Sequence, residues 1–345
     1  MLGDKKKTET KLQPVWTAVV PDHVVGVAWS SNGSQVAAAA VNGPVVVYEA
    51  ASGRILFDLS GHDFGTAALA FHPTDPLLAT AGQDGKIRLW GTILGQKRAA
   101  FDGGAAWVEK LAWSPDGKQL ASAAGKKVRI WELATGDMLR EYTAHPATIA
   151  DIAWQPKSSI LAVAVYGGVL LYDVISDDPP RHFEWKGSPL KLAWSPNGKL
   201  LAHGNQDATV HFWYADTGLD LQMSGYPTKI RELAWDFASR TLATGGGEMV
   251  CVWDCGGKGP AGTTPKMFEA HKKPVSTLAF QRRGFLLASG GQDGRLCLWQ
   301  PANRTPLLAG VTFEETEITD LAWSPDDRSM LVGSANGGVG LFKVV

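Results

Sequence analysis

The sequence has little of what several large classes of protein depend on. Three cysteines, Cys251, Cys255 and Cys297, are too few and too unevenly spaced for a disulfide framework, so we expect a reducing, cytoplasmic setting. No apolar run is long enough to cross a bilayer, and the first ten residues contain no apolar segment typical of a signal peptide. The formal net charge is −1, whereas nucleic-acid-binding proteins usually carry a basic excess. The sequence therefore argues against a membrane partner and against a nucleic-acid partner.

Residues that could hold a metal or a nucleotide are also scarce. Cys251 and Cys255 have a spacing that zinc sites use, but a second pair of ligands is missing nearby. The glycines at 245–247 lie between two strand-like segments and not in the strand-to-helix setting of a phosphate-binding loop. We expect no metal and no cofactor.

Tryptophan and glycine, in contrast, are abundant, with 14 and 39 copies, and they follow a repeat. A short phrase, which reads VAWS at 27–30 and LAWSPDD at 321–327, occurs eight times at intervals of 40 to 45 residues. Its aromatic residues are Trp29, Phe71, Trp113, Trp154, Trp194, Trp235, Phe280 and Trp323. A second series runs parallel to the first and consists of Tyr48, Trp90, Trp131, Tyr172, Trp213, Trp253, Trp299 and Phe342.

Each repeat contains short strand-like runs separated by turn residues. In the unit that begins at residue 66, TAALAF, PLLATA, KIRLW and KRAAF alternate with Pro-, Asp- and Gly-rich turns, which predicts an antiparallel meander. Four short strands cannot bury both of their faces alone. The units must therefore stack, and a closed ring leaves no open end.

These phrases resemble the WD40-repeat family of β-propellers. LAWSPDG at 111–117, LATAGQDGKIRLW at 78–90 and LASGGQDGRLCLW at 287–299 carry the resemblance, although the Trp-Asp pair that ends the third run of a repeat is present only at 253–254. The resemblance implies an all-β, eight-bladed propeller with four-stranded antiparallel blades. It covers residues 13–345, and we expect a monomeric ring.

The two ends of the chain complement each other. The last repeat ends at residue 345 after its third strand, and residues 13–20 form a strand-like run without a repeat of their own. We predict that residues 13–20 supply the outer strand of the last blade and close the ring, after a flexible tail at 1–12.

Two sets of polar residues could suggest a hydrolase, because each combines a hydroxyl, an imidazole and a carboxylate. The family resemblance implies instead a buried hydrogen-bond chain that ends on an indole, so we expect no catalytic residue. In two other blades, Tyr226 and Trp185 occupy the position of the histidine. The two sets are His62, Thr80, Asp84 and Trp90, and His271, Ser289, Asp293 and Trp299.

The family resemblance also implies that a partner binds on the face that carries the loops entering each first strand and the turns between second and third strands. Trp107 is the first candidate, because it belongs to neither aromatic series and immediately precedes a first strand. Tyr166 replaces a turn carboxylate. Polar residues at matching positions are His23, Gln83, Glu109, Gln206, Lys229, Arg231, Gln292 and Glu317.

The leading functional hypothesis is an adaptor or scaffold that binds a protein or peptide. An enzyme with a site in the central channel is one alternative, but the acids expected there come from different blades without an evident pair: Glu109, Asp151, Glu232 and Asp320. A subunit of a nucleic-acid-associated complex is the other alternative.

Overall fold

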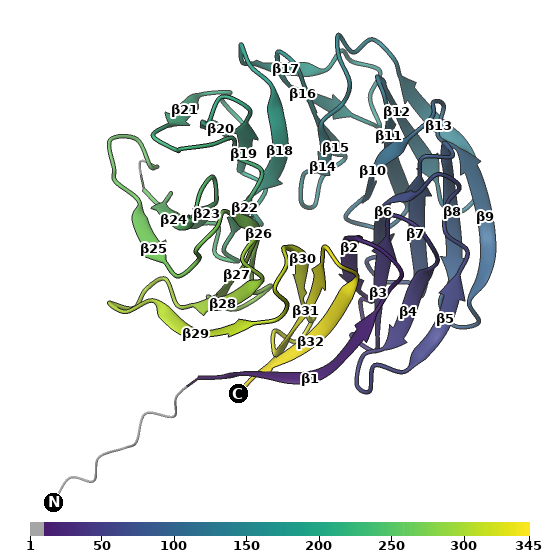
Figure 1. The fold of residues 1–345 in the computed structure, drawn as a ribbon. Helices are drawn as coiled ribbons and strands as arrows, with labels where there is room; N and C mark the ends of the chain where they lie inside the picture. Colours follow the sequence, from purple (N-terminus) through teal and green to yellow (C-terminus); the bar gives the residue numbers. More distant parts are fainter. Residues whose placement is uncertain (1–9, 258) are drawn as a thin grey trace, which may run out of the picture.

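Eight four-stranded antiparallel sheets stand around one axis in the computed structural model, which describes residues 10–257 and 259–345 (Figure 1). The predicted all-β, eight-bladed architecture is thereby confirmed. Most of the expected tail at 1–12 lies outside the described residues. No helix in the described part of the chain is long and apolar enough to cross a membrane.

The first four blades follow one another along the chain. Their strands are β2 (Val24–Trp29), β3 (Gln35–Ala40), β4 (Val45–Glu49) and β5 (Ile55–Leu59) in blade 1; β6 (Thr66–Phe71), β7 (Leu77–Gly82), β8 (Lys86–Gly91) and β9 (Gln96–Asp102) in blade 2; β10 (Val108–Trp113), β11 (Gln119–Ala124), β12 (Lys127–Glu132) and β13 (Met138–Tyr142) in blade 3; and β14 (Asp151–Trp154), β15 (Ile160–Val165), β16 (Gly168–Asp173) and β17 (Arg181–Glu184) in blade 4.

The remaining blades repeat this pattern until the last, which borrows its outer strand from the beginning of the chain. Their strands are β18 (Pro189–Trp194), β19 (Leu200–Asn205), β20 (Val210–Tyr214) and β21 (Asp220–Met223) in blade 5; β22 (Leu233–Trp235), β23 (Thr241–Thr244), β24 (Met249–Asp254) and β25 (Lys266–Glu269) in blade 6; β26 (Val275–Phe280), β27 (Leu287–Gly291), β28 (Arg295–Trp299) and β29 (Leu307–Thr312) in blade 7; and β30 (Ile318–Trp323), β31 (Ser329–Ser334), β32 (Gly338–Val344) and β1 (Leu12–Val19) in blade 8.

The ring closes through β1, as predicted. This strand pairs antiparallel with β32, from Leu12 opposite Val344 to Val19 opposite Gly338. Trp16 on β1 also reaches the neighbouring blade, where its indole N–H donates to the Ala50 carbonyl at 2.9 Å. One strand therefore completes blade 8 and contacts blade 1.

The core lies between blades, in interfaces that we call seams. At six seams, the first-strand tryptophan of one blade donates its indole N–H to an alanine carbonyl in the first strand of the preceding blade, at 2.9 to 3.2 Å. The pairs are Trp29–Ala322, Trp113–Ala70, Trp154–Ala112, Trp194–Ala153, Trp235–Ala193 and Trp323–Ala279.

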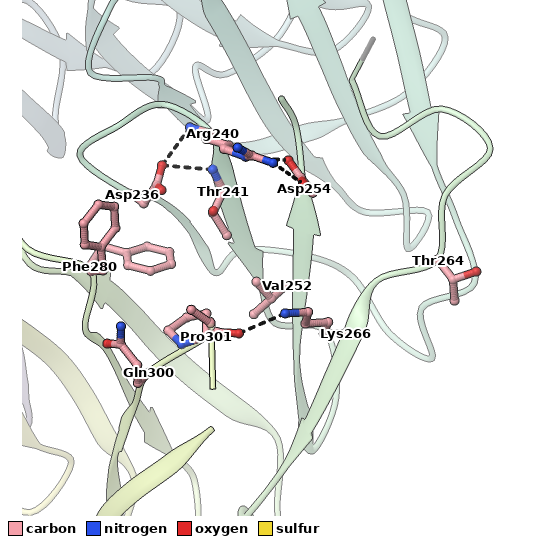
Figure 2. A pocket seen from close by; sticks show the side chains of 12 residues that line it. Asp236, Arg240, Thr241, Val252, Asp254, Thr264, Lys266, Phe280, Gln300 and Pro301 are labelled. Carbon is pink, nitrogen blue, oxygen red and sulfur yellow. Dashed lines mark hydrogen bonds and ion pairs between the residues drawn. The ribbon is translucent and has the colours of Figure 1, made fainter. Parts of the chain in front are cut away.

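Two seams lack this indole bond because phenylalanine has no N–H group. Phe71 stands at the seam between blades 1 and 2, and Phe280 at the seam between blades 6 and 7 (Figure 2). These two phenylalanines already interrupt the first aromatic series in the sequence.

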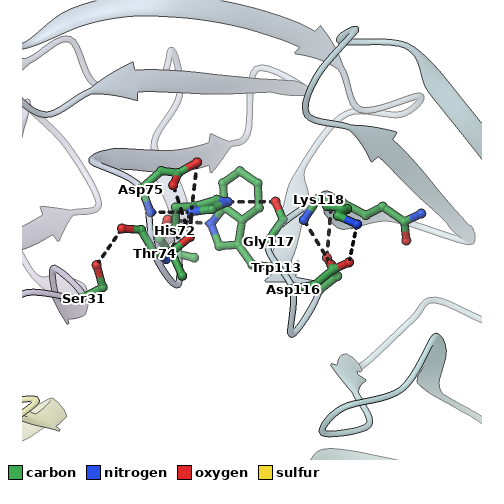
Figure 3. A network of polar contacts seen from close by, with 11 residues as sticks. Ser31, His72, Thr74, Asp75, Trp113, Asp116, Gly117 and Lys118 are labelled. Carbon is green, nitrogen blue, oxygen red and sulfur yellow. Dashed lines mark hydrogen bonds and ion pairs between the residues drawn. The ribbon is translucent and has the colours of Figure 1, made fainter.

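Loops at the two ends of the blades form two faces. The front face carries the loops that enter each first strand and the turns between second and third strands, and the back face carries the other turns. On the back face, the His72 imidazole donates from Nε2 to the Gly117 carbonyl at 2.8 Å, which joins the turns of blades 2 and 3 (Figure 3). Its other nitrogen, Nδ1, accepts the Asp75 backbone N–H at 2.8 Å.

Candidate functional site

All ten residues expected to meet a partner lie on the front face. The turns of this face are tied to the loops beside them, since the backbone N–H of Gln83 donates to Gly65 O and that of Gln292 to Pro274 O. Exposed members are Trp107, Glu109, Tyr166, Gln206, Lys229, Arg231 and Gln292, and half-buried members are His23, Gln83 and Glu317. The ten are spread around the ring and do not gather in one pocket.

Two aromatic side chains make blade 2 the most distinctive part of this face. Trp107 is 55% exposed and Phe64 is 82% exposed. Both residues have a φ of 65°, a left-handed conformation that is rare for bulky side chains. A strained backbone that presents a large apolar side chain to water is typical of a functional surface.

Hydrogen bonds place these two residues on opposite sides of one turn. The loop that carries Phe64 accepts the Gln83 N–H at Gly65 O, 2.9 Å away. The loop that carries Trp107 begins with Gly103, whose N–H donates to Gly85 O at 2.8 Å. Both loops are therefore fixed to the turn between β7 and β8.

The hydrogen-bond chain of blade 2 connects this turn, between β7 and β8, to the interior of the blade. The Trp90 indole donates to Thr80 Oγ1 at 3.0 Å, and Thr80 Oγ1 lies 2.9 Å from His62 Nε2. His62 Nδ1 lies 2.8 Å from Asp84 in the turn. Because His62 belongs to the loop of Phe64 and Asp84 to the turn, the chain braces both parts of the aromatic surface.

Blade 7 contains the same arrangement. The Trp299 indole donates to Ser289 Oγ at 2.8 Å, and His271 lies 2.7 Å from Ser289 and 3.2 Å from Asp293. Burial lowers the pKa of both His62 and His271, which favours the neutral imidazole that these chains require. The hydroxyls of Thr80 and Ser289 are completely buried and engaged on two sides, so neither is open to a substrate.

Other blades replace the chain in different ways. In blade 6, the Trp253 indole donates to the Tyr226 hydroxyl at 2.8 Å, which lies 2.8 Å from Thr244 Oγ1, so a tyrosine takes the place of the histidine. In blade 3, the Trp131 indole donates to Ser122 Oγ at 3.0 Å. These substitutions keep buried polar groups partnered, as burial requires.

Blade 5 departs from this pattern. His203 takes the place of the hydroxyl, and Trp185 takes the place of the histidine and packs on His211 with ring centroids 3.6 Å apart. Five buried side-chain nitrogens have no hydrogen-bond partner among the described residues, although His211 Nδ1 lies 3.4 Å from Asp220 Oδ2: Trp185 Nε1, His203 Nε2, His211 Nδ1, His211 Nε2 and Trp213 Nε1. This blade therefore contains an unusual concentration of unsatisfied polar groups.

The central channel contains carboxylates that bind the backbone of the next blade. Asp320 accepts the Val27 N–H at 2.9 Å, and Asp151 accepts the Leu192 N–H at 3.0 Å and lies 3.3 Å from Lys191 Nζ. Burial raises the pKa of Asp320 to about 6. These acids connect neighbouring first strands.

Within residues 10–257 and 259–345, no group of three or more His, Cys, Asp or Glu side chains is close enough together to hold a metal ion. Cys251, Cys255 and Cys297 are buried, unpaired thiols. Burial raises their pKa values to about 11, 12 and 12, which keeps the thiols protonated at neutral pH.

Sequence reasoning singled out Trp107 and missed Phe64. The signal for both is the same, because Phe64 also stands outside the two aromatic series and shortly before a first strand, β6. The conformation that both share depends on loop geometry and could not be derived from residue types.

Comparison with known proteins gives a family match along the ring. The profile described as "WD domain, G-beta repeat" (WD40) matches residues 53–91, 95–132, 181–214, 262–300 and 310–343, which together exceed half of the chain.

Curated relatives are distant and longer. "Cell division cycle 20.6, cofactor of APC complex" from Arabidopsis thaliana is 26% identical over 85% of this chain and 62% of its own length. "Protein HIR1" from Candida albicans is 21% identical over 81% of this chain and 26% of its own length. "Meiotic fizzy-related protein 1" from Schizosaccharomyces pombe is 28% identical over 43% of this chain and 33% of its own length. The chain thus spans less than two thirds of each of these relatives.

A solved structure shares the fold along nearly the whole chain. The crystal structure of the computationally designed Ika8 protein superposes with a TM-score of 0.82, covering 96% of this chain and 99% of that one, at 21% identity. At this identity the likeness concerns the fold alone.

Proposed function

Since the chain belongs to the WD40-repeat family, we propose that it is a non-catalytic adaptor that holds a protein or peptide partner on the front face around blade 2. The observation that carries this proposal is the pair of exposed aromatic side chains, Phe64 and Trp107, on loops fixed to one braced turn. Aromatic side chains of this kind are the usual anchors of protein interfaces.

Three further observations support the proposal. Charged residues of both signs lie on the front face, among them Glu109 and Arg231, which suits a polypeptide better than a phosphate backbone. The hydroxyl–imidazole–carboxylate sets are buried within blades and serve as braces. One relative is named a cofactor of a complex, which agrees with a role among other proteins. Unpaired cysteines favour a cytoplasmic setting for this role.

A quantitative capture experiment tests the proposal. The full chain and the double variant Phe64→Gly/Trp107→Gly are used as bait in extracts of the source cell, and bound proteins are quantified by mass spectrometry. Glycine adopts a φ of 65° without strain, so the variant should keep its fold. Loss of an aromatic anchor costs roughly 2 kcal/mol, or about thirtyfold in affinity, so the bound proteins should be strongly depleted.

The matched control is Ile93→Ala, which removes a 70% exposed apolar side chain from the back face. This variant should recover the same proteins as the unmodified chain. Equal recovery by the double variant and the unmodified chain would contradict the proposal.

A further inference from the structure

The seam between blades 6 and 7 contains a pocket of about 450 Å³ on the back face. It is lined in part by Arg240, Asp254, Lys266 and Phe280 (Figure 2). The pocket lies at one of the two seams where the first-strand residue is phenylalanine, so no indole occupies the gap or bonds across it.

The turns above this seam also meet in an unusual way. Phe237 and Phe285, from the first turns of blades 6 and 7, form an edge-to-face pair with ring centroids 4.6 Å apart. They remain 37% and 50% exposed, although aromatic rings are normally withdrawn from water. Phe285 and Phe280 line the pocket and give it an aromatic wall that fits a bulky apolar side chain, and Phe237 supports Phe285 from beside the pocket.

The carboxylates around this pocket already accept hydrogen bonds, and Asp254 also forms an ion pair. Asp254 accepts from the Arg240 guanidinium at 3.0 and 3.2 Å, and Asp236 accepts the backbone N–H groups of Arg240 and Thr241 at 2.8 and 2.9 Å. Asp327, in the adjoining turn of blade 8, accepts the N–H groups of Arg282 and Arg283 at 2.7 and 2.8 Å.

Cations in the same region remain available. The exposed Lys266 Nζ donates to the Pro301 carbonyl at 3.1 Å, and within the described residues it forms no ion pair (Figure 2). Arg304, in the loop after Pro301, is also exposed and has no carboxylate partner in the described part of the chain. The cations Arg240, Lys266 and Arg304 outnumber the carboxylates Asp236 and Asp254, so the surface around the pocket carries a small positive excess.

We propose that this seam binds an extended acidic segment of another protein, with one bulky apolar side chain inserted against Phe280 and Phe285 and carboxylates facing Lys266 and Arg304. The surface is separate from the front face and does not depend on the function proposed above.

Fluorescence anisotropy with defined peptides tests this proposal on the full chain. The probe is a fluorescein-labelled acidic peptide of aspartate and glutamate with one central phenylalanine. Two control peptides replace either the phenylalanine with serine or all the acids with lysine. The probe should bind with a dissociation constant below about 1 mM and at least about tenfold more tightly than either control. Absence of saturation at about 1 mM, or equal binding of the basic peptide, would overturn the proposal.

Variants then locate the bound peptide. Phe280→Trp introduces the residue found at six equivalent positions and fills the pocket with an indole that can reach the Ala234 carbonyl, so it should block binding without loss of thermal stability. Lys266→Glu should weaken binding about tenfold through repulsion of the acids. Phe64→Gly, on the opposite face, should change nothing. Unchanged affinity in the first two variants, or loss of affinity in the third, would place the peptide elsewhere and refute the assignment.

Discussion

Acid should destabilise this propeller through His203. Its side chain is completely buried on β19, with Nδ1 2.8 Å from Asn205 Oδ1 and Nε2 without a partner in the described residues. The Asn205 oxygen accepts a hydrogen bond, so the proton of the neutral ring is on Nδ1, and a second proton would place a charge at the unpartnered Nε2. Burial and the neighbouring His211 lower the pKa of His203 from 6.5 to about 3.

The size of the effect follows from proton linkage. As the pH falls from 8 to 5, the unfolded chain protonates His203 and the folded chain does not, so the free energy of unfolding decreases. With pKa values of 6.5 unfolded and about 3 folded, this one residue contributes a loss of about 2 kcal/mol between pH 8 and pH 5. The loss begins as the pH falls through 6.5 and stops growing below about pH 3.

The measurement is urea unfolding at pH 8 and at pH 5, followed by tryptophan fluorescence, for the unmodified chain and His203→Ser. Four other histidines also have lowered pKa values: His62, His145, His211 and His271. The free energy of unfolding of the unmodified chain should therefore decrease by more than the contribution of His203 alone. The variant should lose about 2 kcal/mol less over this pH range. His182→Ser, which removes an exposed imidazole from β17, is the control. The same pH dependence in His203→Ser and the unmodified chain would refute the reasoning.

Two structural elements give further predictions. Deletion of residues 1–20 removes β1 and Trp16, so the free energy of unfolding should fall by about 3 kcal/mol or more, whereas deletion of residues 1–9, which spares β1, should have little effect in the same urea titration. Thr80→Val keeps the shape of the side chain but leaves Trp90 N–H and His62 Nε2 without their shared oxygen, so it should cost about 2–4 kcal/mol. Thr312→Val on exposed β29 should be nearly neutral, and equal stability of the two valine variants would argue against the brace.

Repetition explains why the fold could be predicted. The two aromatic series mark the first and third strands of every unit, and they fix the register because a one-residue slip would move each aromatic side chain to the opposite face of its sheet. The closing strand could be predicted because residues 13–20 form a strand-like run without a repeat of their own, and the last repeat ends after its third strand.

The surfaces were less predictable, because they depend on how different repeats meet. Trp107 stood out by its position, but its left-handed backbone did not. Phe237 and Phe285 lie 48 residues apart in ordinary-looking turns, and their contact depends on how blades 6 and 7 meet. The unsatisfied nitrogens of blade 5 likewise follow from packing between side chains and not from residue type.

The two phenylalanines of the first aromatic series divide the circle unequally. Indole bonds link blades 2 to 6 in one continuous arc and blades 7, 8 and 1 in another, and the two arcs meet where Phe71 and Phe280 stand. The Phe64 loop spans one of these joints, and the acidic-peptide pocket lies within the other. The Phe64 loop and the pocket therefore stand at the two places where neighbouring first strands are not joined through an indole, one on each face of the ring.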